Sequence, residues 1–198
     1  VRMRLIRKAV WKAAGACKDI TAAHLQAVAD LLEKQTGRYV KLPYGLTATR
    51  VYNVIEIMGK RKETEKICLP IDTDRLPENL LAGEWKFSFK KFLYDGNTDK
   101  IPRKMYTKWF DYDKIKDSLA IRNRRKGDYF VLDAAGHHKK LEDYFVNEKI
   151  PASHRDEQLL LAGEDEIFWI VGGRMAYGTG ISDATRWVLE ITASNSSH

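Results

Sequence analysis

Apolar side chains in the first fourteen residues recur at intervals of three and four positions, at Leu5, Ile6, Ala9, Val10 and Ala13. This spacing is typical of an amphipathic helix, and it leaves the basic side chains largely on the other faces. After Gly15, Thr21 is suited to cap a second helix, whose apolar stripe ends at Gly37. The pattern predicts a helical hairpin over residues 1–36.

From Arg38 onward the residue types become those of strands. Segments 38–42 and 47–58 are rich in β-branched and aromatic residues and flank the turn sequence Pro43-Tyr44-Gly45, which predicts a β-hairpin. Three further strands are expected between Pro, Asn, Asp and Gly residues, at 66–71, 85–89 and 105–110. The middle of the chain is therefore expected to be mostly sheet.

The last eighty residues mix both kinds of pattern. We expect a strand over 118–122, a polar turn at 124–128, short helices over 139–148 and 153–158, and a buried strand pair at 159–161 and 166–171. The predicted class is α+β, with an N-terminal helical hairpin followed by a mixed, mainly antiparallel β-rich domain with short helices. The predicted divisions are residues 1–50, a β-rich middle section over 51–117, and a C-terminal α+β domain over 118–198.

Composition supports a folded domain. Of 198 residues, 44% are hydrophobic and 11% aromatic, which is enough to bury a core. No apolar run approaches the ~20 residues of a membrane-spanning helix, and no secretion signal is visible. The two cysteines, Cys17 and Cys68, are expected to be free thiols in a reducing compartment, which predicts a cytoplasmic protein. Because the chain opens with Val1 inside a helical pattern, we expect it to be part of a longer protein.

Positive charge is concentrated in two segments. The formal net charge is +7, from 34 basic and 27 acidic residues. Residues 1–20 hold six bases against one acid, and residues 122–140 hold six against two. Such patches suggest a surface that contacts phosphates, although a solvated charged face is an equal alternative for a basic domain. Charge alone does not distinguish RNA, DNA and an anionic small molecule as the partner.

The familiar signatures of catalysis and metal binding are missing from the sequence. It contains no GxxxxGK[ST] or GxGxxG loop, no GxSxG elbow, no CxxC and no HExxH. The five histidines are mostly isolated, and His137-His138 is expected to be an exposed basic turn. We therefore expect neither catalytic residues nor a metal site in this chain.

The remaining candidate chemistry is an arginine cluster over residues 121–128, followed by Lys139-Lys140 and by Arg155-Asp156. Guanidinium groups bind phosphates in a bidentate manner, which favours phosphate contact for the cluster as a whole. The alternative for single arginines is structural. Arg122 and Arg155 could instead pair with Asp128 or Asp156 inside the fold.

The order and spacing of several motifs resemble the C-terminal domain of bacterial tRNA(Ile)-lysidine synthetases. These motifs are Arg122-x-Arg124-Arg125-x-Gly127-Asp128, Lys139-Lys140-Leu141-x-Asp143-Tyr144-Phe145, Lys149-Ile150-Pro151-x-x-x-Arg155-Asp156 and Ile167-x-Trp169-x-x-Gly172-x-Arg174. Segments near the N-terminus, such as Ile6-Arg7-Lys8-Ala9 and Leu42-Pro43-Tyr44-Gly45-Leu46, resemble the region that follows the catalytic domain in that family. The resemblance covers nearly the whole chain.

This resemblance implies a tRNA-recognising C-terminal fragment of a ligase that acts in tRNA modification. In that family an N-terminal ATP-pyrophosphatase domain with an SGGxDS-like loop uses ATP and magnesium to join lysine to the wobble cytidine of isoleucine tRNA with a CAU anticodon. That loop is absent here, so the fragment is expected to hold no cofactor and to be inactive alone. The implied partners are this tRNA and the N-terminal domain of the same chain, with a homodimer left open and no membrane.

On this basis residues 1–50 are expected to be a substrate-recognition segment and residues 118–198 a tRNA-binding domain. The expected tRNA-binding residues are Arg4, Arg7, Lys8, Arg122, Arg124, Arg125, Lys126, Lys139, Lys140, Arg155 and Arg174. The alternative function is a scaffold whose arginines serve an interface with the catalytic domain or a second subunit. A stand-alone enzyme would require a catalytic constellation that the sequence does not show.

Overall fold

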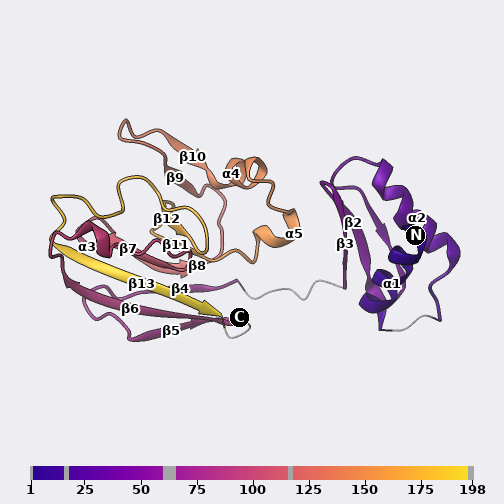
Figure 1. Cartoon of the computed structure of the whole chain (residues 1–198), viewed down its shortest axis with the longest axis horizontal. Helices are drawn as coiled ribbons and strands as arrows, with labels where there is room; N and C mark the ends of the chain where they lie inside the picture. The colour runs from indigo at the N-terminus through magenta and orange to yellow at the C-terminus, as the bar shows by residue number, and fades with distance from the viewer. Residues whose placement is uncertain (1, 16–17, 60–65, 116–117, 196–198) are drawn as a thin grey trace. The chain divides into compact units, whose positions relative to one another are not determined.

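The computed structural model describes residues 2–15, 18–59, 66–115 and 118–195 (Figure 1). Contacts divide the chain into two compact units, Val1–Thr64 and Glu65–His198. Each unit has its own hydrophobic core. The predicted boundaries at residues 50 and 117 do not coincide with this division.

The smaller unit packs two helices and a short 3₁₀ helix against a three-stranded antiparallel sheet, in the order β1-β2-β3. Its elements are α1 (Arg2–Ala14), α2 (Ala22–Asp30), η1 (Leu31–Glu33), β1 (Tyr39–Lys41), η2 (Pro43–Gly45), β2 (Thr47–Val51) and β3 (Val54–Met58). The predicted helical hairpin is confirmed. The predicted strand over 47–58 is two strands, because the backbone turns at Tyr52, where φ is 48°.

Local chemistry explains where the second helix begins. The Thr21 hydroxyl accepts a hydrogen bond from the His24 backbone N–H, and the His24 ring accepts one from the Thr21 N–H. This reciprocal cap satisfies two backbone donors that a helix start leaves unpaired. The core beneath it contains Val10, Leu25, Val28, Leu31, Leu42, Leu46 and Ala48. Val10 is the one buried residue of α1, so most of that helix faces solvent.

The larger unit contains two four-stranded antiparallel sheets and a two-stranded ribbon, in the orders β5-β6-β13-β7, β12-β11-β8-β4 and β10-β9. Its strands are β4 (Cys68–Pro70), β5 (Asn79–Ala82), β6 (Trp85–Leu93), β7 (Thr107–Asp111), β8 (Ala120–Arg122), β9 (Tyr129–Val131), β10 (His138–Lys140), β11 (Leu160–Ala162), β12 (Ile167–Ile170) and β13 (Trp187–Asn195). Its helices are η3 (Thr98–Lys100), α3 (Tyr112–Ile115), α4 (Leu141–Asn147) and α5 (Ala152–Arg155).

The sheet that contains β11 and β12 forms the middle layer of this unit (Figure 1). On one face Leu161 and Trp169 pack with Phe110 and Ile191 of the β13 sheet. On the other face Leu160 and Ala162 belong to a second cluster with Phe130 and Phe145, and this cluster holds β9 and α4 in place. Since side chains alternate between the faces of a strand, β11 contributes to both clusters.

The α+β class is confirmed, but the predicted divisions within the larger unit differ from the observed pairing. Strand β8 pairs with β4, and β13 pairs with both β6 and β7, so residues on the two sides of position 117 share their sheets. The sequence prediction missed β5, β9, β10 and β13. Strand β13 extends to Asn195, and residues 196–198 lie outside the described residues.

The structure also bears on the cysteines and on membrane-spanning helices. Cys68 is an exposed free thiol, and Cys17 lies outside the described residues. None of the described helices has both the length and the apolar character needed to cross a lipid bilayer.

Leu161→Ala should lower the free energy of unfolding by about 2–5 kcal/mol, because it leaves a cavity where both sheets meet. Leu161 is 0% exposed, whereas Leu81 on β5 is 69% exposed. The control Leu81→Ala should therefore stay within about 0.5 kcal/mol of the parent. Urea unfolding followed by tryptophan fluorescence measures both, and equal effects would contradict the assignment of Leu161 to the core.

Candidate nucleic-acid interface

The arginine cluster lies on the loop from Asn123 to Gly127, which joins β8 to β9. A buried ion pair between Arg122 and Asp128 closes this loop, with Nη1 to Oδ2 at 2.9 Å and Nη2 to Oδ1 at 2.8 Å. The side chains of the pair are 1% and 0% exposed. Arg122 also donates to the backbone oxygens of Asn123 and Glu164, at 3.1 and 3.0 Å. Both terminal nitrogens of the guanidinium are therefore engaged inside the fold, as in the structural alternative that the sequence left open, whereas the buried Nε has no hydrogen-bond partner. The guanidinium does not reach a phosphate at the surface.

Further hydrogen bonds fix the ends of the loop. The Asp128 carboxylate accepts a hydrogen bond from the Arg125 backbone N–H at 2.7 Å. The Asp128 backbone oxygen accepts one from the N–H of Leu141 at 2.9 Å, where α4 begins. The Asn123 amide oxygen accepts the Ile67 N–H at 2.7 Å. These bonds tie the loop to α4 and to the segment before β4, so its exposed side chains start from a well-positioned backbone.

Arg124 is held by carboxylates at the edge of the loop. Its Nε and Nη2 lie 2.8 and 2.7 Å from Asp156 Oδ1, and its Nη1 lies 3.7 Å from Glu142 Oε1. The side chain is 30% exposed. Arg155 is half-buried and donates from Nε to the Ile150 backbone oxygen at 2.9 Å. Both arginines therefore help to hold α4 and α5 in place.

Arg125 and Lys126 are the exposed bases of the loop. The Arg125 Nη2 lies 3.0 Å from the Cys68 sulfur, and the residue remains open to solvent. Gly127 has a φ of 100°, a conformation that a residue with a side chain rarely adopts, and it turns the chain from the exposed bases toward buried Asp128.

The two lysines of β10 point to opposite faces of the β9-β10 ribbon. Lys139 pairs in register with Phe130 and is half-buried, whereas Lys140 pairs with Tyr129 and is exposed. Directly opposite residues of an antiparallel pair share a face. Lys140 therefore lies on the face of Tyr129.

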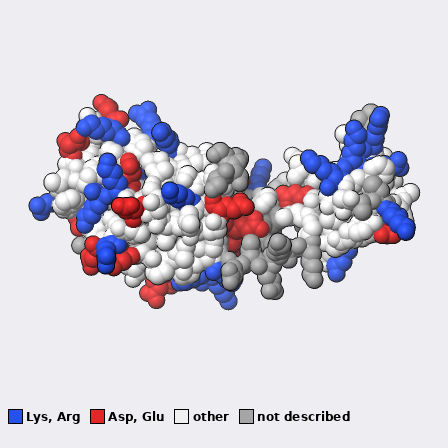
Figure 2. All heavy atoms as spheres, turned by 90° about the horizontal axis from the view of Figure 1, so that it is seen from below, with Lys and Arg blue, Asp and Glu red and all other residues white. Residues whose placement is uncertain are grey.

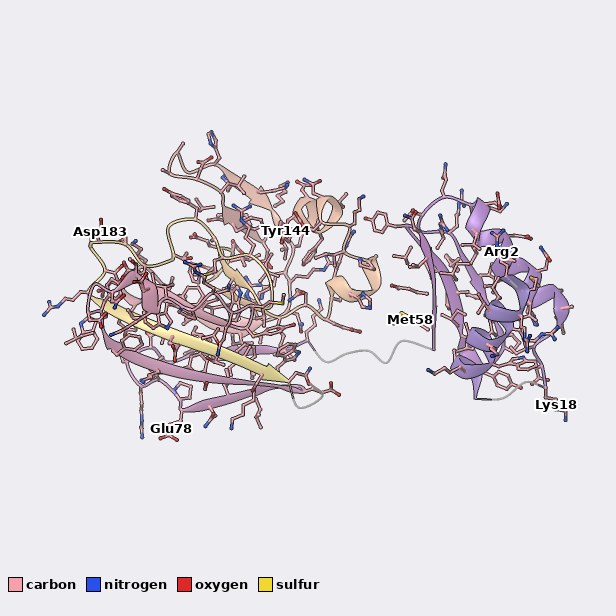
Figure 3. All side chains as sticks on the ribbon, in the orientation of Figure 1. Arg2, Lys18, Met58, Glu78, Tyr144 and Asp183 are labelled. Atoms are coloured by element: carbon pink, nitrogen blue, oxygen red, sulfur yellow. The ribbon has the colours of Figure 1, made fainter. Side chains whose placement is uncertain are left out.

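Arg174 reaches this region from the turn after β12. It is exposed, and its guanidinium carbon lies 5.4 Å from the centre of the Phe130 ring, within reach of a cation–π interaction. Phe130 in turn meets the Tyr144 ring edge to face, at 5.2 Å (Tyr144 in Figure 3). Partial burial, and then the nearby Glu148, raise the pKa of Tyr144, and Arg174 opposes that shift. The phenol therefore stays neutral throughout the physiological range.

At the tip of the ribbon, His137 Nδ1 lies 2.9 Å from Asp133 Oδ2. This hydrogen bond lowers the pKa of the Asp133 carboxyl below its usual value. His137 and His138 are exposed, as predicted, and the described residues contain no group of three His, Cys, Asp or Glu side chains able to hold a metal ion.

The three predicted residues of the N-terminal segment belong to the smaller unit. Arg4, Arg7 and Lys8 are exposed on α1, and Arg7 lies 5.5 Å from the centre of the Trp11 ring. Figure 2 shows Lys and Arg side chains around the edge of the smaller unit, whereas acidic and basic side chains are interspersed over the larger one. The predicted tRNA-binding set did not include the aromatic residues between the basic side chains, namely Tyr129, Phe130 and Tyr144, of which Tyr144 stands in a motif quoted for the resemblance. Alternation of side chains in 129–131 was the signal that could have found the first two.

Residues 119–191, which include the loop and the ribbon, match the family model described as the TilS substrate C-terminal domain. Over 192 residues the chain is 32% identical to the tRNA(Ile)-lysidine synthase of Caldanaerobacter subterraneus subsp. tengcongensis, covering 96% of this chain and 40% of that protein. The resemblance to tRNA(Ile)-lysidine synthases is confirmed. The synthase of Clostridium perfringens is 29% identical over 197 residues, which cover 96% of this chain and 42% of that protein.

The chain thus spans about 40% of the length of these tRNA(Ile)-lysidine synthases. A crystal structure of a TilS C-terminal domain is also similar, with a TM-score of 0.49 and 19% identity, covering 67% of this chain and 98% of that chain.

Asp128→Ala should lower the free energy of unfolding by about 3–5 kcal/mol, because it leaves the Arg122 guanidinium buried without its counter-charge. The control is Glu142→Ala, which removes a 3.7 Å contact from a carboxylate that is 62% exposed. That change should cost less than about 1 kcal/mol. Chemical denaturation measures both variants, and equal costs would contradict a structural role for the buried pair.

Proposed function

We propose that this chain is the tRNA-recognising part of a tRNA(Ile)-lysidine synthase. The observation that carries the proposal is the loop inside the TilS C-terminal domain, where a buried ion pair supports the exposed Arg125 and Lys126. The proposal that the RNA is isoleucine tRNA comes from the names of the relatives. Basic side chains on a rigid support suit RNA binding, because duplex RNA is recognised mainly through its shape and its phosphates.

The exposed bases are expected to contribute unequally. Arg125, Lys126, Lys140 and Arg174 are open to solvent and can meet phosphates directly. Arg124 would have to exchange its carboxylate partners for phosphate, which offsets part of the gain. Lys139 and Arg155 are half-buried and fit a supporting role better. Arg4, Arg7 and Lys8 on α1 form a second basic surface, which we assign to the tRNA body near the anticodon arm.

The reaction belongs, in this proposal, to the part of the relatives that the chain does not cover. An N-terminal ATP-pyrophosphatase domain would join lysine to the wobble cytidine of isoleucine tRNA with a CAU anticodon, using ATP and magnesium in the cytoplasm. No step of that reaction is assigned to residues of this chain. Its contribution is to select the tRNA and to orient it through contacts away from the reacting base.

A second candidate function, protein contact, is favoured by the apolar residues on α1. Leu5 is 61% exposed and Met3 is 40% exposed. Exposed apolar side chains on a helix suit a protein interface with the catalytic domain or a second subunit. Such an interface would depend weakly on salt, whereas RNA binding would weaken steeply as salt rises.

Arg125→Ala and Lys126→Ala should each weaken binding to a CAU-anticodon isoleucine tRNA transcript and reduce the slope of log K against log salt by about 0.7–0.9. Lys90→Ala on β6 is the control, since Lys90 is an exposed base of the sheet beyond the middle layer. Filter binding from low to physiological salt measures the slopes. Unchanged slopes for both loop variants would overturn the proposal, and parallel titration of elongator methionine tRNA tests selectivity.

A further inference from the structure

A hollow of about 210 Å³ opens on the larger unit outside the basic cluster. Its lining includes two aromatic side chains, Trp85 and Tyr106, and three polar ones from the segment that ends α5, His154, Glu157 and Gln158. None of these residues belongs to the predicted tRNA-binding set. The hollow is therefore separate from that set.

The aromatic wall consists of Trp85 and Tyr106, and the Tyr106 ring packs closely against the backbone at Gly172. The Tyr106 and Trp85 ring centres lie 5.2 Å apart with their planes tilted by 45°. A Cβ at Gly172, where φ is +77°, would lie 2.6 Å from Tyr106 Cε1, so only glycine lets the ring lie there. Tyr106 nevertheless remains 37% exposed. An aromatic ring held firmly in place and still exposed is suited to stacking.

The polar wall consists largely of acceptors. The Gln158 Nε2 donates to the backbone oxygens of Leu159 and Val171, at 3.1 and 2.9 Å. Both amide hydrogens are therefore used, and the amide oxygen is what remains to meet a ligand. Glu157 adds an exposed carboxylate. The backbone N–H groups of Glu157 and Gln158 both donate to the His154 oxygen at 3.2 Å, a turn that fixes the segment carrying all three side chains.

Size and charge narrow the class of ligand. A volume of about 210 Å³ is below the ~300–1,000 Å³ of pockets for drug-sized molecules, so it suits one ring system. A carboxylate disfavours phosphate but accepts hydrogen bonds from the edge of a base. Stacking on aromatic side chains together with hydrogen bonds to the Watson–Crick edge is how proteins hold unpaired bases of RNA. Guanine presents two adjacent donors on that edge, N1–H and the N2 amino group.

We propose that this hollow binds one unpaired guanine base of an RNA, stacked on Tyr106 and hydrogen-bonded to Glu157. The inference rests on the proposed function, which supplies RNA as the polynucleotide that carries the base. It adds a site that recognises a base rather than the phosphate backbone. Phosphate contacts position an RNA, whereas base contacts specify it. The hollow thus supplies specificity that the basic loop cannot provide.

The test uses the whole chain and two fluorescein-labelled single-stranded RNAs, UUUGUUU and UUUUUUU, in an anisotropy titration at low salt. The guanine-containing RNA should bind about fivefold tighter or more, as a good bidentate base contact provides. Equal affinities would overturn the proposal.

Variants of Glu157 and Tyr106 test whether the guanine preference depends on these two side chains. Glu157→Gln should abolish the preference for UUUGUUU, whereas a carboxylate that merely repels RNA would tighten binding of both RNAs when neutralised. Glu78→Gln is the matched control, because Glu78 is exposed and lies at the opposite end of the unit from α5 (Figures 1 and 3).

Tyr106→Ala should weaken binding of UUUGUUU by about 5–100-fold, and Tyr106→Phe should preserve that affinity, since stacking needs only the ring. Loss of affinity in both Tyr106 variants, or a preference that survives Glu157→Gln, would overturn the proposal.

The two proposals fail in different ways. If the hollow does not bind a base, salt-dependent tRNA binding and its dependence on Arg125 and Lys126 persist, and only the guanine preference is missing. If the chain does not recognise tRNA, that salt dependence is itself absent from the tRNA titrations.

Discussion

The buried ion pair between Arg122 and Asp128 is the interaction on which the rest of the interface depends. Removing two charges from water is costly, and the bidentate geometry together with two backbone acceptors offsets that cost. The pair closes the loop between β8 and β9, and Asp128 also receives the backbone N–H of Leu141, where α4 begins. One buried contact thus positions the exposed bases and the helix beside them.

The layered core explains how such a small outer layer stays ordered. A two-stranded ribbon is marginal by itself, because it cannot bury an apolar face. Here β9 and α4 pack through Phe130 and Phe145 onto strands β11 and β12, which are buried on both faces. The ribbon can therefore carry Lys140 on its exposed face, and Phe130 supports the guanidinium of Arg174.

The charged loop and the aromatic hollow would meet two different demands of the proposed RNA binding. Exposed Arg and Lys side chains act through long-range electrostatics, so they tolerate acidic neighbours such as Glu142 and need only a fixed backbone. A site for a nucleic-acid base acts at contact distance and needs fixed side chains. That is why Gly172 matters beneath Tyr106 and why two backbone acceptors hold the Gln158 amide.

The sequence by itself determined the α+β class, the helical hairpin with its Thr21 cap, and the order of motifs shared with tRNA(Ile)-lysidine synthases. These features depend on neighbours a few residues apart, so periodicity and spacing reveal them. Only the tertiary structure decided that Arg122 is buried, that β13 joins β6 to β7, and that Trp85, Tyr106 and Glu157 line one hollow. Pairing between distant strands places those residues together, and no local pattern encodes which segments will pair.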